Sequence, residues 1–213
     1  TYMAEPNLSP LGSVYPDYNL GITNSFSYKG LSMSFLIDIQ KGGKFYSLSH
    51  MWGMYSGMLD ASAQINDRGT NIREPVADGG GILLDGVRGD VTFNDDGTYT
   101  VANATENETY TSGELWSRYH YHGLGTPSAQ SVFDADYVKL REVTLGYNLG
   151  SLFNDFVKRA RVSVYGRNLA TWGLDLDGFD PEMTVVGSGN IQGIDGGLQP
   201  MARNIGIKLD LTF

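Results

Sequence analysis

The sequence has 213 residues, among them 28 glycines and 13 tyrosines, with 18% charged residues and a net charge of −9. This composition is typical of a turn-rich, all-β protein. The acidic balance and the lack of any basic run exclude a nucleic-acid-binding protein, because phosphate backbones are bound by clustered Lys and Arg. Without cysteine, the chain has no disulfides, no Cys-ligated zinc and no thiol catalysis. No window holds the ~20 apolar residues of a transmembrane helix, and residues 1–10 lack the pattern of a signal peptide.

The first segments with period-2 alternation run over about residues 18–28 and 31–40. Only Lys29 and Gly30 separate them, and a two-residue loop pairs its flanking residues directly. Tyr28 therefore lies opposite the first residue of the second segment, and the apolar stripes of both segments share one face. The pattern predicts a β-hairpin.

Residues 41–136 lose this alternation and are rich in Gly, Asn, Asp, Ser and Thr. Loops of such length are uncommon in compact soluble domains and are usually functional. Helical spacing over residues 50–62, and a small hairpin pattern over residues 90–101 around the turn 94–97, predict that the loop is partly structured.

Three further strands are predicted over about residues 137–148, 159–169 and 201–213, with a second long loop over residues 170–200. Within the first of these strands the apolar residues change parity between Lys139 and Glu142, which predicts either a β-bulge or a strand that leaves the apolar layer there. The last strand alternates without interruption and ends on an aromatic residue.

The connections between the five predicted strands are short, very long, short and long. Outer-membrane barrels have short periplasmic turns and longer extracellular loops, so we expect an antiparallel transmembrane β-barrel segment with residues 41–136 and 170–200 outside the cell. The alternative is a soluble β-sandwich, whose strands also alternate. Because five strands cannot close a barrel that holds cargo, we expect the chain to be part of a larger barrel.

Short motifs resemble SusC/RagA-type TonB-dependent transporters. These motifs follow the family's order over nearly all of residues 14–213. They are "YKG" with a following "GG", "YVKLREVTLGY", "VYGRNLATW", "GFDPE" and "GLQPMARNIGIKLDLTF". The departures are Gln199, where an aromatic usually precedes the proline, and Phe179 for the commoner Tyr.

The resemblance implies that residues 1–213 are the C-terminal part of a plugged barrel of about 22 strands in the outer membrane of a Gram-negative bacterium. It implies active import of an oligosaccharide or peptide cargo with a SusD-like surface lipoprotein. The plug, which contacts TonB, would precede Thr1. No cofactor, no nucleic acid and no enzymatic activity are expected. The rival function is a secreted or surface β-sandwich that binds carbohydrate, and an enzyme comes third.

Large aromatic residues in the long loops are the candidates for cargo recognition, because flat apolar rings stack on sugars and fix ligand orientation. Aromatics near strand ends also form the interfacial girdles of membrane barrels, and others pack a loop against itself. The candidates are Trp52, Tyr55, Trp116, Tyr119, Tyr121 and Trp172.

An acidic stretch in the second long loop is a weak candidate for calcium, since carboxylate oxygens are the ligands that this ion prefers. Its members are Asp175, Asp177, Asp180 and Glu182. Their spacing is not that of an EF-hand. We favour a turn in which the carboxylates accept hydrogen bonds from backbone amides, and we assign no metal site and no catalytic residue.

Overall fold

The computed structural model describes residues 8–121, 128–152, 156–184 and 192–213. The chain divides into two compact units, one comprising residues 1–11 and 46–132 and the other residues 12–45 and 133–213. In the part of the chain that the structure describes, no helix is long and apolar enough to cross a membrane.

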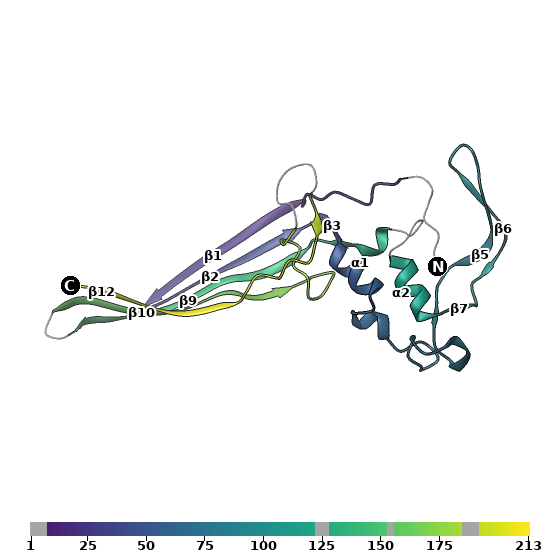
Figure 1. The fold of residues 1–213 in the computed structure, drawn as a ribbon. Helices are drawn as coiled ribbons and strands as arrows, with labels where there is room; N and C mark the ends of the chain where they lie inside the picture. The colour runs from purple at the N-terminus through teal and green to yellow at the C-terminus, as the bar shows by residue number, and fades with distance from the viewer. Residues whose placement is uncertain (1–7, 122–127, 153–155, 185–191) are drawn as a thin grey trace. The chain divides into compact units, whose positions relative to one another are not determined.

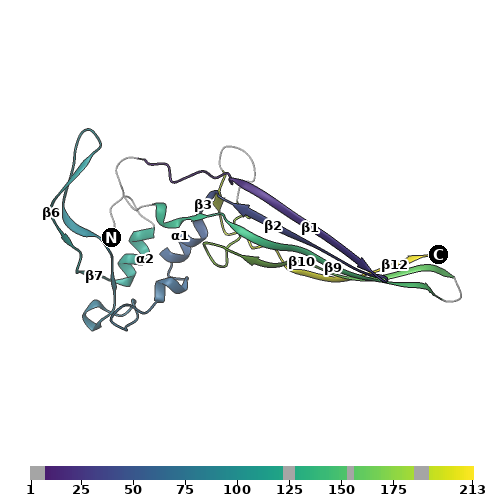
Figure 2. The ribbon, with the colours of Figure 1, turned by 180° about the vertical axis from the view of Figure 1, so that it is seen from behind.

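The second unit is built on a five-stranded sheet in which every neighbouring pair is antiparallel. Both ribbon views show the strands side by side (Figures 1 and 2). The predicted antiparallel, mainly β fold is thus confirmed. In sheet order the strands are β1 (Tyr18–Tyr28), β2 (Leu31–Lys41), β9 (Tyr137–Leu152), β10 (Val157–Trp172) and β12 (Asn204–Thr212).

The hairpin of β1 and β2 has the predicted register, with Tyr28 paired to Leu31. Lys29 and Gly30 have φ angles of 45° and 85°. Positive φ at both central residues is the feature of the type I′ turn, whose twist matches that of the flanking strands. The glycine adopts this conformation without a steric cost.

The strands differ from their predicted ranges at the ends. β9 and β10 run further than their alternation indicated, because Val157 pairs with Leu152 and Trp172 pairs with Val138. β12 begins at Asn204, three residues later than expected. Side-chain alternation marks only the part of a strand that has two different faces, whereas backbone pairing continues beyond it.

The first unit contains two α-helices, α1 (Leu48–Tyr55) and α2 (Gly113–Tyr121), which pack against each other. Ser47 begins α1 as its N-cap, since its side chain accepts a hydrogen bond from the backbone N–H of His50 at 3.0 Å. The short elements of this stretch are the 3₁₀ helices η1 (Asp60–Ala63), η2 (Val76–Asp78) and η3 (Ser128–Ser131) and the paired strands β4 (Ile82–Leu83) and β7 (Tyr110–Thr111).

The long loop is therefore a folded body with a core of its own, and the prediction that it is partly structured is confirmed. Apolar side chains from both helices and from the intervening chain form this core. The buried members are Met54, Ile72, Leu84 and Trp116, and the partly buried members are Leu59, Ile82 and Tyr121.

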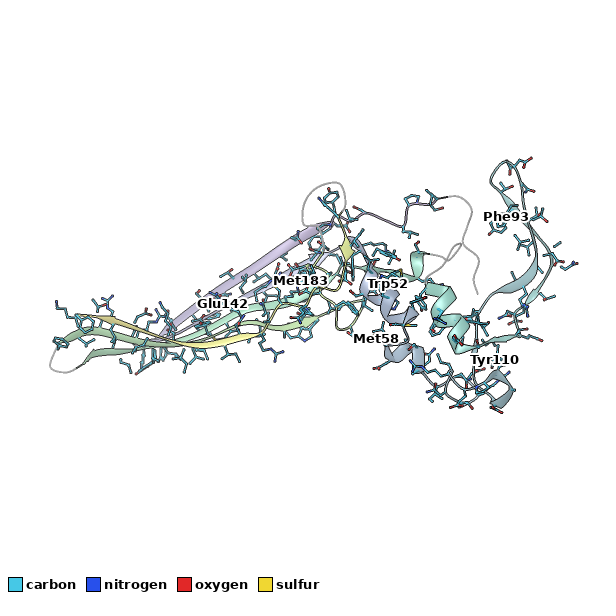
Figure 3. All side chains as sticks on the ribbon, viewed as in Figure 1. Trp52, Met58, Phe93, Tyr110, Glu142 and Met183 are labelled. Carbon is cyan, nitrogen blue, oxygen red and sulfur yellow. The ribbon has the colours of Figure 1, made fainter. Side chains whose placement is uncertain are left out.

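The predicted small hairpin is also present, formed by β5 (Val87–Phe93) and β6 (Tyr99–Glu106). Val91 pairs with Val101 and Phe93 pairs with Tyr99, as expected. Every residue of both strands is exposed, and Phe93 is labelled in Figure 3. A separate three-stranded sheet has the order β11 (Ile194–Asp195), β3 (Lys44–Ser47) and β8 (Val132–Asp134).

Candidate functional site

The five-stranded sheet has one apolar and one polar face. Residues that are directly opposite in an antiparallel pair share a face, so the register sorts the side chains, which project from both faces of the sheet in Figure 3. The apolar face carries Leu20, Ile22, Phe26, Leu31, Met33, Phe35, Ile37, Ile39, Leu140, Val143, Leu145, Val162, Val164, Ile205, Ile207, Leu209 and Leu211.

A β-bulge at Arg141 keeps the apolar face continuous along β9. Leu36 pairs with Glu142 and Ile37 pairs with Leu140, so Arg141 has no partner on β2. One extra residue shifts the side-chain parity, and for this reason the apolar residues on either side of the bulge remain on one face. The bulge predicted between Lys139 and Glu142 is confirmed.

Much of this apolar face is exposed. Ile207 is 76% exposed, Ile205 72% and Leu209 59%. A β-sandwich would cover such a face with a second sheet, whereas a membrane barrel presents it to lipid. The exposure therefore favours the barrel among the two architectures that the alternation allowed.

Exposed aromatic residues border the apolar face at both ends of the sheet. At the end with the short turns they are Tyr28, Tyr147, Phe156 and Phe213, and at the other end they are Tyr18 and Trp172. The rings of Phe156 and Phe213 make an edge-to-face contact with centroids 5.5 Å apart. Two such rows are the arrangement of the aromatic girdles at the two membrane interfaces.

The spacing of the two rows matches a membrane. β1 begins at Tyr18 and ends at Tyr28, and this length of strand covers about 33 Å at about 3.3 Å per residue. A barrel strand tilted by about 40° then spans about 25 Å along the membrane normal, which is about the height of the apolar band of outer-membrane barrels. Trp172, a candidate for cargo binding, has a position that fits this girdle.

On the polar face, the second long loop is tied to β9 by ion pairs. The Lys139 ammonium pairs with Asp180 at 2.6 Å and also with Glu182. The Arg141 guanidinium pairs with Asp38 of β2 at 2.6 Å and with Glu182. In Figure 3, Met183 marks the place of this loop on the sheet. We call the group Asp38, Lys139, Arg141, Asp180 and Glu182 the loop tie.

The loop tie is largely buried. The Lys139 side chain is 5% exposed and that of Glu182 is 22% exposed. Charges at such positions are stable only when they are paired and hydrogen bonded. The Tyr137 hydroxyl also donates a hydrogen bond to Glu182 at 2.9 Å, so this carboxylate has donors from three side chains of β9.

These contacts set the protonation state of Glu182, which lies in the loop outside the strands. Burial alone would raise the pKa of its carboxyl group, but hydrogen bonds from Arg141 and Lys139 outweigh burial and lower the pKa to about 2. The carboxylate is therefore ionised at any physiological pH, and it holds both cations in place.

Three of the four carboxylates in the acidic stretch have protein partners. Asp180 and Glu182 belong to the loop tie, and Asp175 accepts a hydrogen bond from the backbone N–H of Asp134 at 2.9 Å. Asp177 is exposed. Among the described residues, no group of three or more His, Cys, Asp or Glu is placed to hold a metal ion. The carboxylates of Asp175, Asp180 and Glu182 act as ion-pair or amide partners.

Two of the aromatic candidates pack the core of the first unit. Trp116 is 6% exposed, and its ring makes an edge-to-face contact with Tyr121 at a centroid distance of 5.6 Å. The Tyr121 ring makes a similar contact with His50 at 5.4 Å. Sequence reasoning does not separate such a packing role from a binding role, because both use large aromatic side chains in a loop.

Trp52 and Tyr55 form an aromatic pair at the surface of the first unit, with Trp52 exposed and Tyr55 half-buried. Trp52 is 48% exposed, and its ring stands edge to face against Tyr55 at 5.5 Å. Tyr55 also lies under the Arg118 guanidinium and borders a surface cleft that includes Arg73. Tyr119 belongs to α2, and its side chain lies outside the described residues.

No family model matches the chain. A TonB-dependent receptor P26 of Formosa agariphila is 29% identical over 213 residues, which are 95% of this chain and 18% of that protein. The RagAB peptide importer in its closed-closed state has a chain with a TM-score of 0.60 and 18% identity, matched over 100% of this chain and 19% of its own length. In the open-open state the TM-score is 0.53 and the identity 17%, over 95% of this chain and 18% of the other.

The chain thus spans less than a fifth of the length of the relatives that it matches. The sequence similarity to the TonB-dependent receptor covers both units of this chain. The structural similarity to RagAB shows that the chain shares the fold of the matched part.

Proposed function

Because this chain has the motifs and the fold of SusC/RagA-type TonB-dependent transporters, which are proteins of the Gram-negative outer membrane, we propose that it forms part of the barrel wall of an active importer. One observation supports this most directly. The sheet presents an exposed apolar face between two aromatic rows that lie about 33 Å apart along β1. At a barrel tilt of about 40° this length would span about 25 Å of membrane, and lipid is the environment that such a face requires.

The opposite face then lines the lumen. It is rich in serine, threonine, glycine and charged residues, which tolerate water. The loop tie fixes the loop with Asp180 and Glu182 over this polar face, at the end of β9 away from the short turns. We propose that the two long loops lie outside the cell, where loops on a rigid scaffold commonly carry recognition.

The proposed import needs further parts. TonB would act through a plug that is not contained in this sequence, and a SusD-like lipoprotein would cover the lumen. The cargo is an oligosaccharide or a peptide. The pair of the exposed Trp52 and the half-buried Tyr55 gives the first unit an aromatic surface for either class, since rings stack on sugars and pack against apolar side chains.

The full-length protein tests this proposal. We expect it to fractionate with the outer membrane, to show heat-modifiable migration, and to support uptake of an oligosaccharide or a peptide that stops when the proton gradient is dissipated. A monodisperse, cooperatively folded product of residues 1–213 in detergent-free buffer would contradict the barrel function. It would favour the secreted carbohydrate-binding protein instead.

A further inference from the structure

We infer that the polar face of the wall carries a carboxylate-binding groove centred on Arg161. The inference rests on the proposed function, because it takes this face as the lining of the lumen. The groove lies over β9, β10 and β12. Its lining includes Glu142, Thr144, Arg161, Ser163, Tyr165, Arg167, Lys208 and Asp210.

Charge is unevenly distributed among these groups. Two of the cations have carboxylate partners, since Arg167 pairs with Glu142 at 2.9 Å and Lys208 pairs with Asp210 at 2.7 Å. Both carboxylates of the groove are thereby engaged. Arg161 is the remaining cation, and among the described residues it forms no ion pair.

The Arg161 side chain is directed away from the acidic residue opposite it on the neighbouring strand. Asp210 lies directly opposite it on β12, yet the guanidinium donates a hydrogen bond from Nη2 to the Ser32 hydroxyl of β2 at 2.6 Å. To do so, the side chain crosses β9 above Gly146. A Cβ atom at that glycine would lie 2.7 Å from Nη2 and 2.8 Å from Nε, so the absence of a side chain there makes room for the arginine.

Neutral groups surround the guanidinium. Ser32 and Ser163 pair with Gly146 from its two sides, and Ser163 is buried. A guanidinium has five N–H donors in a planar fork that matches a carboxylate. A neutral hydroxyl accepts only one of these bonds, and Nε is buried without a partner in the part of the chain that the structure describes. The Ser32 hydroxyl in turn donates to the Gly146 carbonyl at 3.2 Å. The arrangement therefore offers a fixed cation among neutral groups, with no anion of its own among the described residues.

The ligand chemistry is a carboxylate, and it has two possible sources. One is the cargo, as the C-terminus or an acidic side chain of a peptide or as a uronic acid. The other is an acidic residue of another segment of the same transporter. If the carboxylate belongs to the cargo, the charge of Arg161 selects acidic cargo over neutral cargo. If it belongs to another segment of the transporter, the same charge holds that segment against the barrel wall.

The test uses the purified full-length transporter and three single variants, Arg161→Ala, Arg161→Lys and Lys158→Ala. Lys158 is an exposed cation of the same strand outside the groove and is the matched control. The probes are a peptide with a free C-terminal carboxylate and its amide, and a uronic-acid oligosaccharide and its neutral counterpart. Affinity and thermal stability are measured for each protein, and heat-modifiable migration reports whether the proposed barrel assembles.

If the carboxylate belongs to the cargo, we expect Arg161→Ala to weaken binding of an acidic probe by about tenfold or more. Binding of the neutral counterpart should be unchanged. A carboxylate within the transporter predicts that Arg161→Ala lowers the thermal midpoint and that Arg161→Lys restores part of it. The deficit should then vanish between about pH 5 and pH 3, where carboxylates become protonated.

If Arg161→Ala and Lys158→Ala have the same probe affinity and the same thermal stability, the inference is overturned, while the proposed barrel function is unaffected. If Arg161→Ala fails to assemble, Gly146→Ala takes its place. This change keeps the charge but displaces the guanidinium, and it should reduce the same readout. Unchanged binding and stability in Gly146→Ala would count against the groove.

Discussion

At the scale of single residues, Glu182 determines how firmly the second long loop is held. We expect Glu182→Gln to loosen the loop because Lys139 and Arg141 lose a charged partner while they remain buried. Breaking a buried pair in this way costs on the order of 3 kcal/mol. Hydrogen exchange of residues 173–184 in the full-length protein should show the increase in opening. The control is Asp177→Asn, which removes an exposed carboxylate of the same loop and should leave exchange unchanged.

The same carboxylate predicts how the loop responds to pH. The pKa of Glu182 is lowered to about 2 in the folded protein from an ordinary value of 4.5, so its stabilising effect is present above 4.5 and is lost as the pH falls toward 2. Exchange of residues 173–184, corrected for intrinsic rates, should increase between pH 5 and pH 3 in the wild type. It should be nearly independent of pH in Glu182→Gln, and a similar increase in both proteins would assign the effect to another group.

At the scale of the strands, the face on which a residue lies determines how much an introduced charge destabilises the protein. Phe35 lies on the apolar face and packs against Phe26 at a ring distance of 6.4 Å, whereas Ser34 lies on the polar face opposite Ser25. We expect Phe35→Arg to lower the free energy of unfolding in lipid vesicles by about 2–4 kcal/mol, and Ser34→Arg to be tolerated. Equal losses in urea-driven unfolding would show that the faces are assigned the wrong way round.

The polar face is not uniformly tolerant. Parity alone would make Gly206 a permissive site, but the Tyr165 ring covers it, and a Cβ atom there would lie 2.6 Å from that ring. A large aromatic over a glycine on the next strand stabilises a sheet by packing against its backbone. Ser34 is therefore the better control, a distinction that alternation alone does not make.

At the scale of the whole molecule, the sequence predicted the wall better than the loops. Strict alternation identified the hairpin register and the change of parity at Arg141, because a sheet with two different faces imposes period 2 on its side chains. Helical spacing around Trp52 and the hairpin pattern around residues 94–97 were also interpreted correctly. These features are local, so they leave a local trace in the sequence.

The candidate site was less predictable because its contacts are distant in the chain. Lys139 and Asp180 meet across 41 positions, and no local pattern pairs them. The signal that was available is the occurrence of two cations, Lys139 and Arg141, beside a parity break on a strand, together with an acidic stretch in the following loop. Likewise, burial distinguishes Trp116 from Trp52, and burial depends on the folded loop.

The exposed hairpin of β5 and β6 gives the last prediction, which concerns the division of the molecule into wall and loops. Residues 87–106 can be removed with little strain, because Gly86 and Asn107 are already joined by a backbone hydrogen bond of 2.9 Å. The hairpin adds no residue to the buried core of its unit. We expect the deletion to leave outer-membrane assembly and heat-modifiable migration intact but to reduce co-purification of the surface lipoprotein or uptake. As a control, Trp116→Ala should disturb the loop core itself and cost about 3–5 kcal/mol. Unchanged co-purification and uptake would remove the hairpin from the proposed recognition surface, and failure of the barrel to assemble would place it in the wall.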